Sequence, residues 1–248
     1  MDNWSHFLVR NRGPLSAREQ LRLQESVVAV VGCGGLGGFV CEELVRLGVG
    51  ELLLIDPDRF EESNCNRQLY ASLQTLGRAK AEVAAERAEQ VHSLCRATAV
   101  VADFRQQTGL LRDRADLVVD CLDNSPARRE LGRFCSSAKI PLVHGAVKGW
   151  YGQVAVQLPG SGLLERFYPP GGRSRQEPPS VLACTVATVA SLQAAEAVKL
   201  LLARHSPLRT SWLSVDLLRL DFLLVPAGEP GSLSGQAACD QQTQQRDQ

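Results

Sequence analysis

The segment VVAVVGCGGLGGF, residues 27–39, constrains the fold of this chain more than any other part of the sequence. Gly32, Gly34 and Gly37 satisfy the pattern Gly-x-Gly-x-x-Gly between a β-branched run and a run with helical spacing. Glycines here permit a sharp turn and let backbone N–H groups approach a phosphate, which the positive end of the helix dipole attracts. The segment therefore predicts a strand, a tight turn and a helix that together bind an anion.

After residue 27, short apolar runs alternate with stretches of helical period, the pattern of a parallel sheet covered by helices. Runs such as VVAVV and ELLLI are apolar throughout, which indicates strands buried on both faces. We expect helices at 36–47, 83–91 and 127–138, and strands at 27–31, 52–55, 98–101, 117–121 and 142–147. The predicted fold class is α/β: a doubly wound, Rossmann-like, mostly parallel sheet with helices on both faces.

The pattern changes after Gly149. Residues 153–157 alternate as a strand, 159–179 are rich in Gly, Pro and Arg and predict a loop, and 181–203 predict a long helix. One or two strands at 211–225 would form a C-terminal antiparallel extension. We therefore divide the chain into an N-terminal helical arm (1–26), a main domain (27–226) and a disordered tail (227–248) rich in Gln.

Composition excludes several classes of function. The chain has 27 Lys and Arg against 27 Asp and Glu, so no overall positive field favours nucleic acid or a membrane surface. The uncharged stretch 178–195 approaches the length of a membrane span, but its prolines, hydroxyl residues and alanines make it too weakly apolar. The first residues lack the apolar run of a secretory signal, so we expect a cytoplasmic protein.

The eight cysteines include no Cys-x-x-Cys pair, so we expect no structural zinc. Most of them lie within apolar runs, where a thiol acts as a small hydrophobic group. We expect Cys184, in the run VLACTVATV, to be packed in the core.

Asp56 ends the second expected strand about twenty residues after the glycine loop, where a carboxylate can accept both hydroxyls of an adenosine ribose. To this point NAD and ATP fit equally well. A triphosphate additionally needs fixed cations and a metal. Arg67 and Lys80 can supply the cations, and Asp123, just beyond the strand LVVDC, can hold Mg²⁺. Because Ser125 before Pro126 predicts a helix N-cap, we expect Asp123 and Asn124 to be free for this work.

These motifs together resemble the ThiF/MoeB/HesA family, relatives of ubiquitin-activating enzymes. GCGGLGG, the strand end ID-x-D, SN-x-NRQ, the lysine after Gly77 and DC-x-DN occur in the order of that family, and the similarity extends over residues 26–203. The family implies adenylation of the C-terminal carboxylate of a small ubiquitin-like protein. The implied nucleotide-binding residues are Gly32, Gly34, Gly35, Leu36, Gly37, Asp56, Asp58, Asn66, Arg67, Gln68, Lys80, Leu122, Asp123 and Asn124, with Asp123 as the Mg²⁺ ligand.

In this family an arginine from the N-terminal segment of a partner subunit also reaches the phosphates, which implies a homodimer. Arg10, in the tripeptide VRN, is our candidate, and Arg12 and Arg18 lie close enough to remain alternatives. The catalytic set implied by the resemblance is therefore Arg10, Arg67, Lys80 and Asp123. Many members carry two zinc-binding Cys-x-x-Cys pairs and some a cysteine in the loop before the last helix. This chain has neither, so the sequence gives no support for a covalent thioester step.

We therefore expect an ATP- and Mg²⁺-dependent adenylyltransferase that activates a ubiquitin-like sulfur carrier ending in Gly-Gly, for a sulfur donor elsewhere. An NAD(P)-dependent oxidoreductase is the first rival, but it leaves Arg67, Lys80 and Asp123 without a task. Activation of a small carboxylate or a tRNA base is the second, and a nucleotide-binding scaffold without turnover is the third. The sequence does not distinguish which carrier or pathway the enzyme serves.

Overall fold

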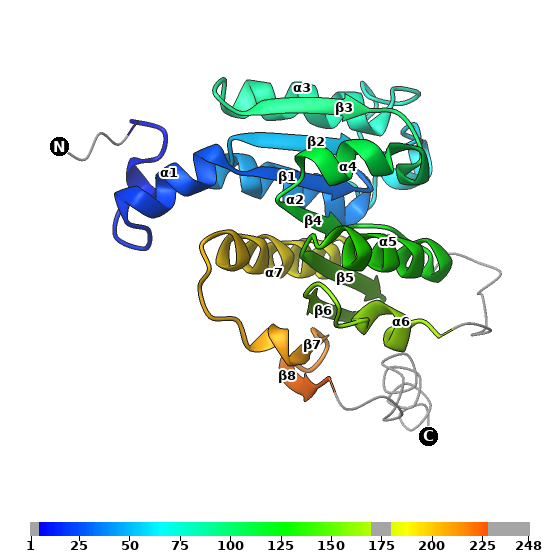
Figure 1. The fold of residues 1–248 in the computed structure, drawn as a ribbon. Coiled ribbons are helices and arrows are strands. Elements are labelled where there is room, and N and C mark those ends of the chain that lie inside the picture. The colour runs from blue at the N-terminus through cyan, green and yellow to red at the C-terminus, as the bar shows by residue number, and fades with distance from the viewer. Residues whose placement is uncertain (1–4, 170–179, 228–248) are drawn as a thin grey trace.

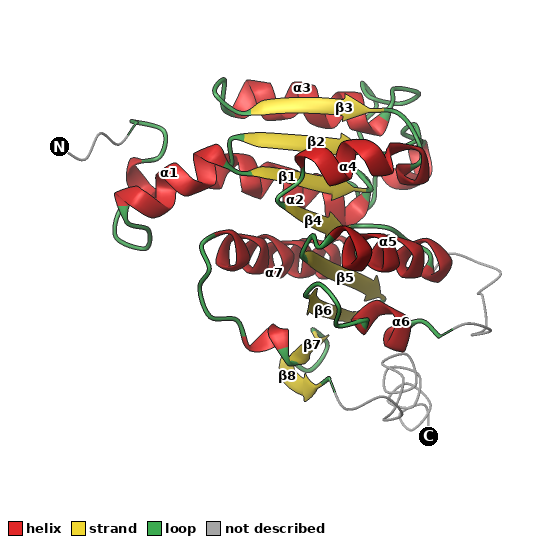
Figure 2. Cartoon of the chain, in the orientation of Figure 1, coloured by secondary structure: helices red, strands yellow, loops and turns green. Residues whose placement is uncertain are grey.

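The computed structural model describes residues 5–169 and 180–227. Its elements are an eight-stranded sheet and seven α-helices within those ranges (Figures 1 and 2). The strands are β1 (Val27–Val31), β2 (Glu51–Ile55), β3 (Arg96–Val100), β4 (Leu117–Asp120), β5 (Leu142–Lys148), β6 (Tyr151–Gln157), β7 (Ser211–Asp216) and β8 (Asp221–Pro226). The helices are α1 (Ala17–Glu25), α2 (Gly35–Leu47), α3 (Lys80–Val91), α4 (Thr108–Arg114), α5 (Ser125–Ala138), α6 (Leu163–Phe167) and α7 (Ala183–Leu201).

The strand order is β3-β2-β1-β4-β5-β6-β7-β8. The first five strands in this order are parallel, and β6, β7 and β8 continue the sheet antiparallel. From β1 the chain adds β2 and β3 on one side of the sheet, and then crosses to the other side to add β4 to β8. The topological switch point therefore lies between β1 and β4. Ligands of open α/β sheets bind at the carboxyl ends of the strands at this point.

Two apolar layers enclose the sheet, because alternate residues of each strand point to opposite faces. Val28 and Val30 of β1 pack with α2, α3 and α7, whereas Ala29 and Val31 pack with α4, α5 and α6. The predicted α/β class is thus confirmed, with the strand at 27–31 matching β1 at both ends.

Two short helices depart from the sequence prediction. Helix α6 interrupts the expected loop 159–179, and α4 lies in a segment for which we predicted no element. They have five and seven residues, too few for a helical period to show in sequence. The predicted tail lies outside the described residues apart from Ala227, whose N–H donates to the carbonyl of Thr210.

Helix α7 is long and apolar enough to meet the criteria for a membrane span, and within the described residues it is the one such helix. Half of the tested window is buried inside the protein. It packs against α2, β5 and β6, and Val189, Ala190, Ala194 and Ala197 belong to the core. The helix is therefore a core element of this fold.

Candidate active site

The glycine loop joins β1 to α2 at the switch point. Gly32 has φ +94°, and a Cβ at this position would lie 2.6 Å from the carbonyl oxygen of Cys121, so only glycine fits. A Cβ at Gly37 would collide with the carbonyl of Gly32. Helix α2 begins with Gly34 as its N-cap, and no side chain caps it. Its first N–H groups therefore remain available for an external anion.

Asp56 holds the loop in place from the end of β2. Its Oδ2 accepts a hydrogen bond from the Cys33 N–H at 2.6 Å, and its Oδ1 accepts one from the Asp58 N–H at 2.7 Å. Burial raises the pKa of the Asp56 carboxyl, while these hydrogen bonds and nearby Lys80 oppose the rise. The carboxylate thus has a structural task in addition to the ribose contact we predicted.

Lys80 begins α3 at the same carboxyl edge of the sheet. We call the region between the glycine loop and the Asp123 segment at this edge the crevice. Its side chain is only 9% exposed, and its Nζ lies 3.0 Å from Oδ2 of Asp58, which is 64% exposed. Because Asp58 is the residue that contacts Asp56, the ammonium group is fixed close to the glycine loop. A mostly buried lysine whose partner is exposed to solvent can pair with an incoming phosphate in place of that partner.

The segment after β2 supplies Asn66, Arg67 and Gln68. The Arg67 guanidinium donates to the Ser63 carbonyl and to Oδ1 of Asn66, at 2.8 and 2.9 Å. The Arg67 carbonyl would lie 3.9 Å from a Cβ on Gly35, so the backbone of this segment lies beside the loop. Gln68 is buried with its amide against Gly34, and its Oε1 has no hydrogen-bond partner. An unpaired buried polar atom beside the loop fits a site that a ligand completes.

Asp123 forms the opposite wall, just beyond β4, and is exposed. The N-cap of α5 is Asn124, whose Oδ1 accepts from the Ala127 N–H at 2.9 Å, so our assignment of Ser125 as the cap was wrong. An extended backbone at Asn124 lets its amide reach the first turn. Asn124 is therefore engaged. Within the described residues Asp123 accepts one hydrogen bond, from the Asn124 Nδ2 at 3.3 Å, and its charge also acts on buried Arg128. An exposed carboxylate fits Mg²⁺, which takes one or two carboxylates with substrate phosphates.

The structure brings the two walls together through the backbone. A Cβ at Gly32 would meet the backbone of Cys121 and Leu122, so the glycine loop and the Asp123 segment adjoin. Arg67 and Lys80 come from segments that both adjoin the loop. Arg10, Arg12 and Arg18 are exposed on the arm, which lies beyond the amino ends of β1 and β2 (Figure 1), opposite the crevice. None of the three is placed near the crevice of its own chain.

The cysteines offer no activated thiol at the loop. Cys33, inside the glycine loop, is fully buried, and its hydrogen bonding with Cys41 together with burial raises the pKa of its thiol. The structure corrects our expectation for Cys184, which is exposed on the first turn of α7. No cluster of three or more His, Cys, Asp or Glu side chains suited to a metal occurs in the described ranges.

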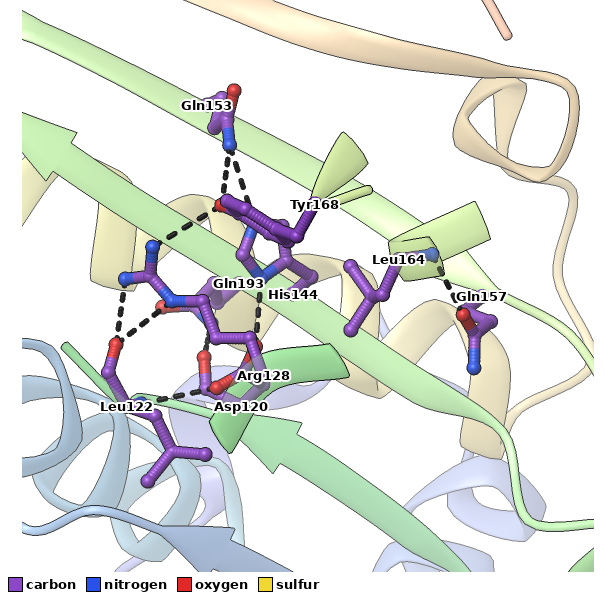
Figure 3. Close-up of polar contacts among 9 residues, drawn as sticks. All are labelled: Asp120, Leu122, Arg128, His144, Gln153, Gln157, Leu164, Tyr168 and Gln193. Carbon is purple, nitrogen blue, oxygen red and sulfur yellow. Dashed lines mark hydrogen bonds and ion pairs between the residues drawn. The ribbon is translucent and has the colours of Figure 1, made fainter. Parts of the chain in front are cut away.

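Sequence reasoning missed a polar cluster, mostly buried, that contacts Leu122, the residue before Asp123 (Figure 3). Its members are dispersed along the chain: Asp120, Arg128, His144, Gln153 and Tyr168, which we call the Tyr168 network. His144, in the apolar run LVHGAV, is the one visible signal, because a polar residue inside a buried strand needs partners.

A glycine loop, a buried lysine and an exposed carboxylate at the switch point define a nucleotide-binding α/β enzyme. A family model described as the ThiF family matches residues 8–233. The SAMP-activating enzyme E1 of Haloferax volcanii is 34% identical over 91% of this chain and 85% of its own. The molybdopterin-synthase adenylyltransferase of Escherichia coli is 33% identical over 82% of this chain and 84% of its own. The chain therefore belongs to the ThiF family, and it is an enzyme of the nucleotidyltransferase class.

Solved structures agree on the fold. E. coli MccB, crystallised with ATP, superposes with a TM-score of 0.77 at 20% identity, over 94% of this chain and 74% of that one. A shorter match, 37% identity over 49% of this chain, is to the tRNA threonylcarbamoyladenosine dehydratase of Haemophilus influenzae. Within one fold, relatives thus act on different substrates.

Proposed function

We propose that the enzyme adenylates the C-terminal carboxylate of a small ubiquitin-like sulfur carrier ending in Gly-Gly. The observation that carries the proposal is Lys80, a fixed and mostly buried cation beside the glycine loop. A dinucleotide would not require it, whereas a triphosphate would. The names of the Haloferax and Escherichia relatives, and the ATP in the MccB crystals, favour the same nucleotide chemistry.

The carrier carboxylate attacks the α-phosphorus in line. One carboxylate O–P bond forms, the bond between the α-phosphorus and the bridging oxygen breaks, and pyrophosphate leaves with its electron pair. Because a carboxylate is ionised at neutral pH, no protein base or nucleophile is needed. The chain contributes positioning and charge neutralisation.

Each wall has a distinct task in this proposal. The N–H groups at the start of α2 hold phosphate oxygens, and Asp56 accepts the ribose hydroxyls. Lys80 and Arg67 offset the charge that develops on the phosphorus and the pyrophosphate. Asp123 would hold Mg²⁺, which when bound neutralises phosphate charge.

We further propose that the enzyme is a cytoplasmic homodimer in which Arg10 of each subunit serves the crevice of the other. The position of the arm, away from its own crevice, supports this arrangement. Arg12 and Arg18 remain alternatives on the same arm.

ATP–pyrophosphate exchange tests the proposal. Purified enzyme should exchange labelled pyrophosphate into ATP only with a carrier of the ThiS or MoaD type present, and a carrier lacking its terminal Gly-Gly should give none. Exchange with a small carboxylate or tRNA alone would support the second rival. Tight nicotinamide-nucleotide binding without exchange would support the oxidoreductase. If the Asp123→Ala variant keeps the protein's biological output, the third rival, a nucleotide-binding scaffold without turnover, is supported.

A further inference from the structure

The Tyr168 network is buried almost completely. Asp120 and His144 have no exposed surface, Tyr168 is 5% exposed and Arg128 9%. Asp120 and His144 are register partners on the adjacent parallel strands β4 and β5, which brings their side chains together. The network therefore joins β4, β5, β6, α5 and the end of α6 (Figure 3).

One arrangement of protons satisfies its hydrogen bonds. His144 Nδ1 lies 2.7 Å from Oδ2 of Asp120, so the N–H donates to the carboxylate. Arg128 and Gln153 both donate to the Tyr168 hydroxyl oxygen, at 3.1 and 2.8 Å. The hydroxyl proton is then directed to His144 Nε2, 3.0 Å away. Burial lowers the pKa of His144, which keeps the ring neutral as this arrangement requires.

The network ends on the backbone of a single residue, Leu122. Asp120 Oδ1 accepts from the Leu122 N–H at 3.0 Å, and the Arg128 guanidinium donates twice to the Leu122 carbonyl, at 3.0 and 2.6 Å. The next residue is Asp123. Both polar groups of Leu122 are thus held by side chains of the network, which leaves the adjoining Asp123 backbone little freedom.

Stability alone does not account for such a cluster. Buried ion pairs bridged by polar groups are often no more stabilising than apolar residues of equal volume, because both charges lose their hydration. What a fully satisfied polar network does provide is a single geometry for the segments that it joins. Here the segment is the one that carries the proposed metal ligand.

We propose that the Tyr168 network positions Asp123 for its metal. Tyr168 is the positioning residue, because its hydroxyl holds the side chains of Arg128 and His144 in place. This inference rests on the proposed function only for the metal; the ordering of residues 122–124 is a property of the free protein. Tyr168 acts through Arg128 and His144 and touches no substrate.

Gln157 provides a matched control. It is 1% exposed, its Nε2 donates to the Gly132 carbonyl, and its Oε1 accepts from the Leu164 N–H, so it ties α5 and α6 to β6. Its contacts join the same helices as the Tyr168 network but none reaches Leu122 (Figure 3). Gln157→Leu should therefore destabilise the protein without changing the Asp123 segment.

The experiment compares Tyr168→Phe and Gln157→Leu with the unaltered protein, all three shown to be folded by circular dichroism. In the free protein, amide hydrogen exchange over residues 122–124 should be about fivefold faster in Tyr168→Phe and unchanged in Gln157→Leu. In carrier-dependent exchange, the Mg²⁺ concentration for half-maximal rate should rise about tenfold in Tyr168→Phe, with the KM for ATP nearly constant.

Should Tyr168→Phe fail to fold, Gln153→Leu removes one donor to the same hydroxyl at the half-buried edge and should shift both readouts in the same direction. Equal exchange over 122–124 in all variants, or equal shifts in the tyrosine and Gln157 variants, would overturn the proposal. If the unaltered enzyme needs no Mg²⁺, the proposed function fails, while hydrogen exchange in the free protein still decides the positioning role.

Discussion

The two walls of the crevice are built by different means. The glycine wall is set by the backbone: Gly37 packs on Gly32, and Asp56 fixes the Cys33 N–H. The Asp123 wall is set by side chains from three strands and two helices, two of which, Asp120 and Arg128, bind the backbone of Leu122. A wall of the first kind leaves no room for an added atom, whereas one of the second kind can adjust in small steps. We therefore expect substitutions in the first wall to affect folding, and those behind the second to affect metal use.

The largest expected effect concerns the arginine that we propose the partner subunit supplies. Arg10→Ala should lower carrier-dependent exchange about 10³-fold or more, as removal of an arginine finger does. Mixing Arg10→Ala with Asp123→Ala subunits should restore about one active site in four, because a mixed dimer retains one complete crevice. Arg12→Ala and Arg18→Ala, measured in the same way, show which of the three arm arginines has this role. No recovery on mixing would refute catalysis across the dimer.

Lys80→Ala should lower the exchange rate about 10²- to 10³-fold, the usual cost of removing a fixed group that stabilises transition-state charge. Because the Lys80 side chain is mostly buried and paired with Asp58, thermal unfolding is measured alongside to separate the loss of charge from the loss of packing. Lys80→Arg, which keeps the charge, should lose less. Steady-state exchange kinetics and calorimetry measure both quantities, and a rate within twofold of the unaltered enzyme would remove Lys80 from the site.

Gly37→Ala and Gly38→Ala test the backbone-built wall. A Cβ at Gly37 collides with the Gly32 carbonyl, whereas one at Gly38 makes an ordinary 3.4 Å contact with the Leu69 Cβ. Gly37→Ala should therefore lower the free energy of unfolding by about 1–3 kcal/mol. Gly38→Ala should be neutral or slightly stabilising because alanine favours the helix. Urea denaturation distinguishes them, and equal losses would show that the loop has more room than we infer.

The smallest expected effect is on the arm. Hydrogen bonds from Arg204 and Ser16 lower the pKa of Glu19 to about 2, and Glu19 ties α1 to the segment after α7. A lowered carboxyl pKa stabilises the folded arm above the unfolded value and loses that contribution as pH falls toward about 2. The protection of α1 amides, corrected for the intrinsic pH dependence of hydrogen exchange, should fall as pH drops toward this value, and Glu19→Gln should abolish the dependence. If the Glu19→Gln variant kept the same pH dependence of exchange in α1, another titrating group would be responsible for it.

The backbone-built wall is also the one that sequence reveals. Gly32 and Gly37 stand in one contiguous motif, and the apolar runs around them predicted β1 at both ends. Asp56 and Lys80 follow at predictable positions because strands and helices alternate along the chain. Parallel order therefore brings them to the same edge of the sheet.

The side-chain-built wall was not predictable in the same way. Asp120 and Tyr168 are 48 residues apart, and only the register of β4 on β5 and the fold of short α6 bring them together. Asn124 rather than Ser125 became the helix cap because helix boundaries vary by one or two residues, and either side chain suits that position. Cys184 lies in an apolar run, but the first turn of α7 directs it outward.

A crystal structure with Mg²⁺ and a non-hydrolysable ATP analogue tests the central claim most directly. We predict the triphosphate between the glycine loop and the Asp123 segment, with the Lys80 ammonium on a phosphate oxygen and the Asp123 carboxylate on the metal. A nucleotide bound away from the β1–β4 switch point, or one bound there with Lys80 and Asp123 both directed away from it, would contradict the account.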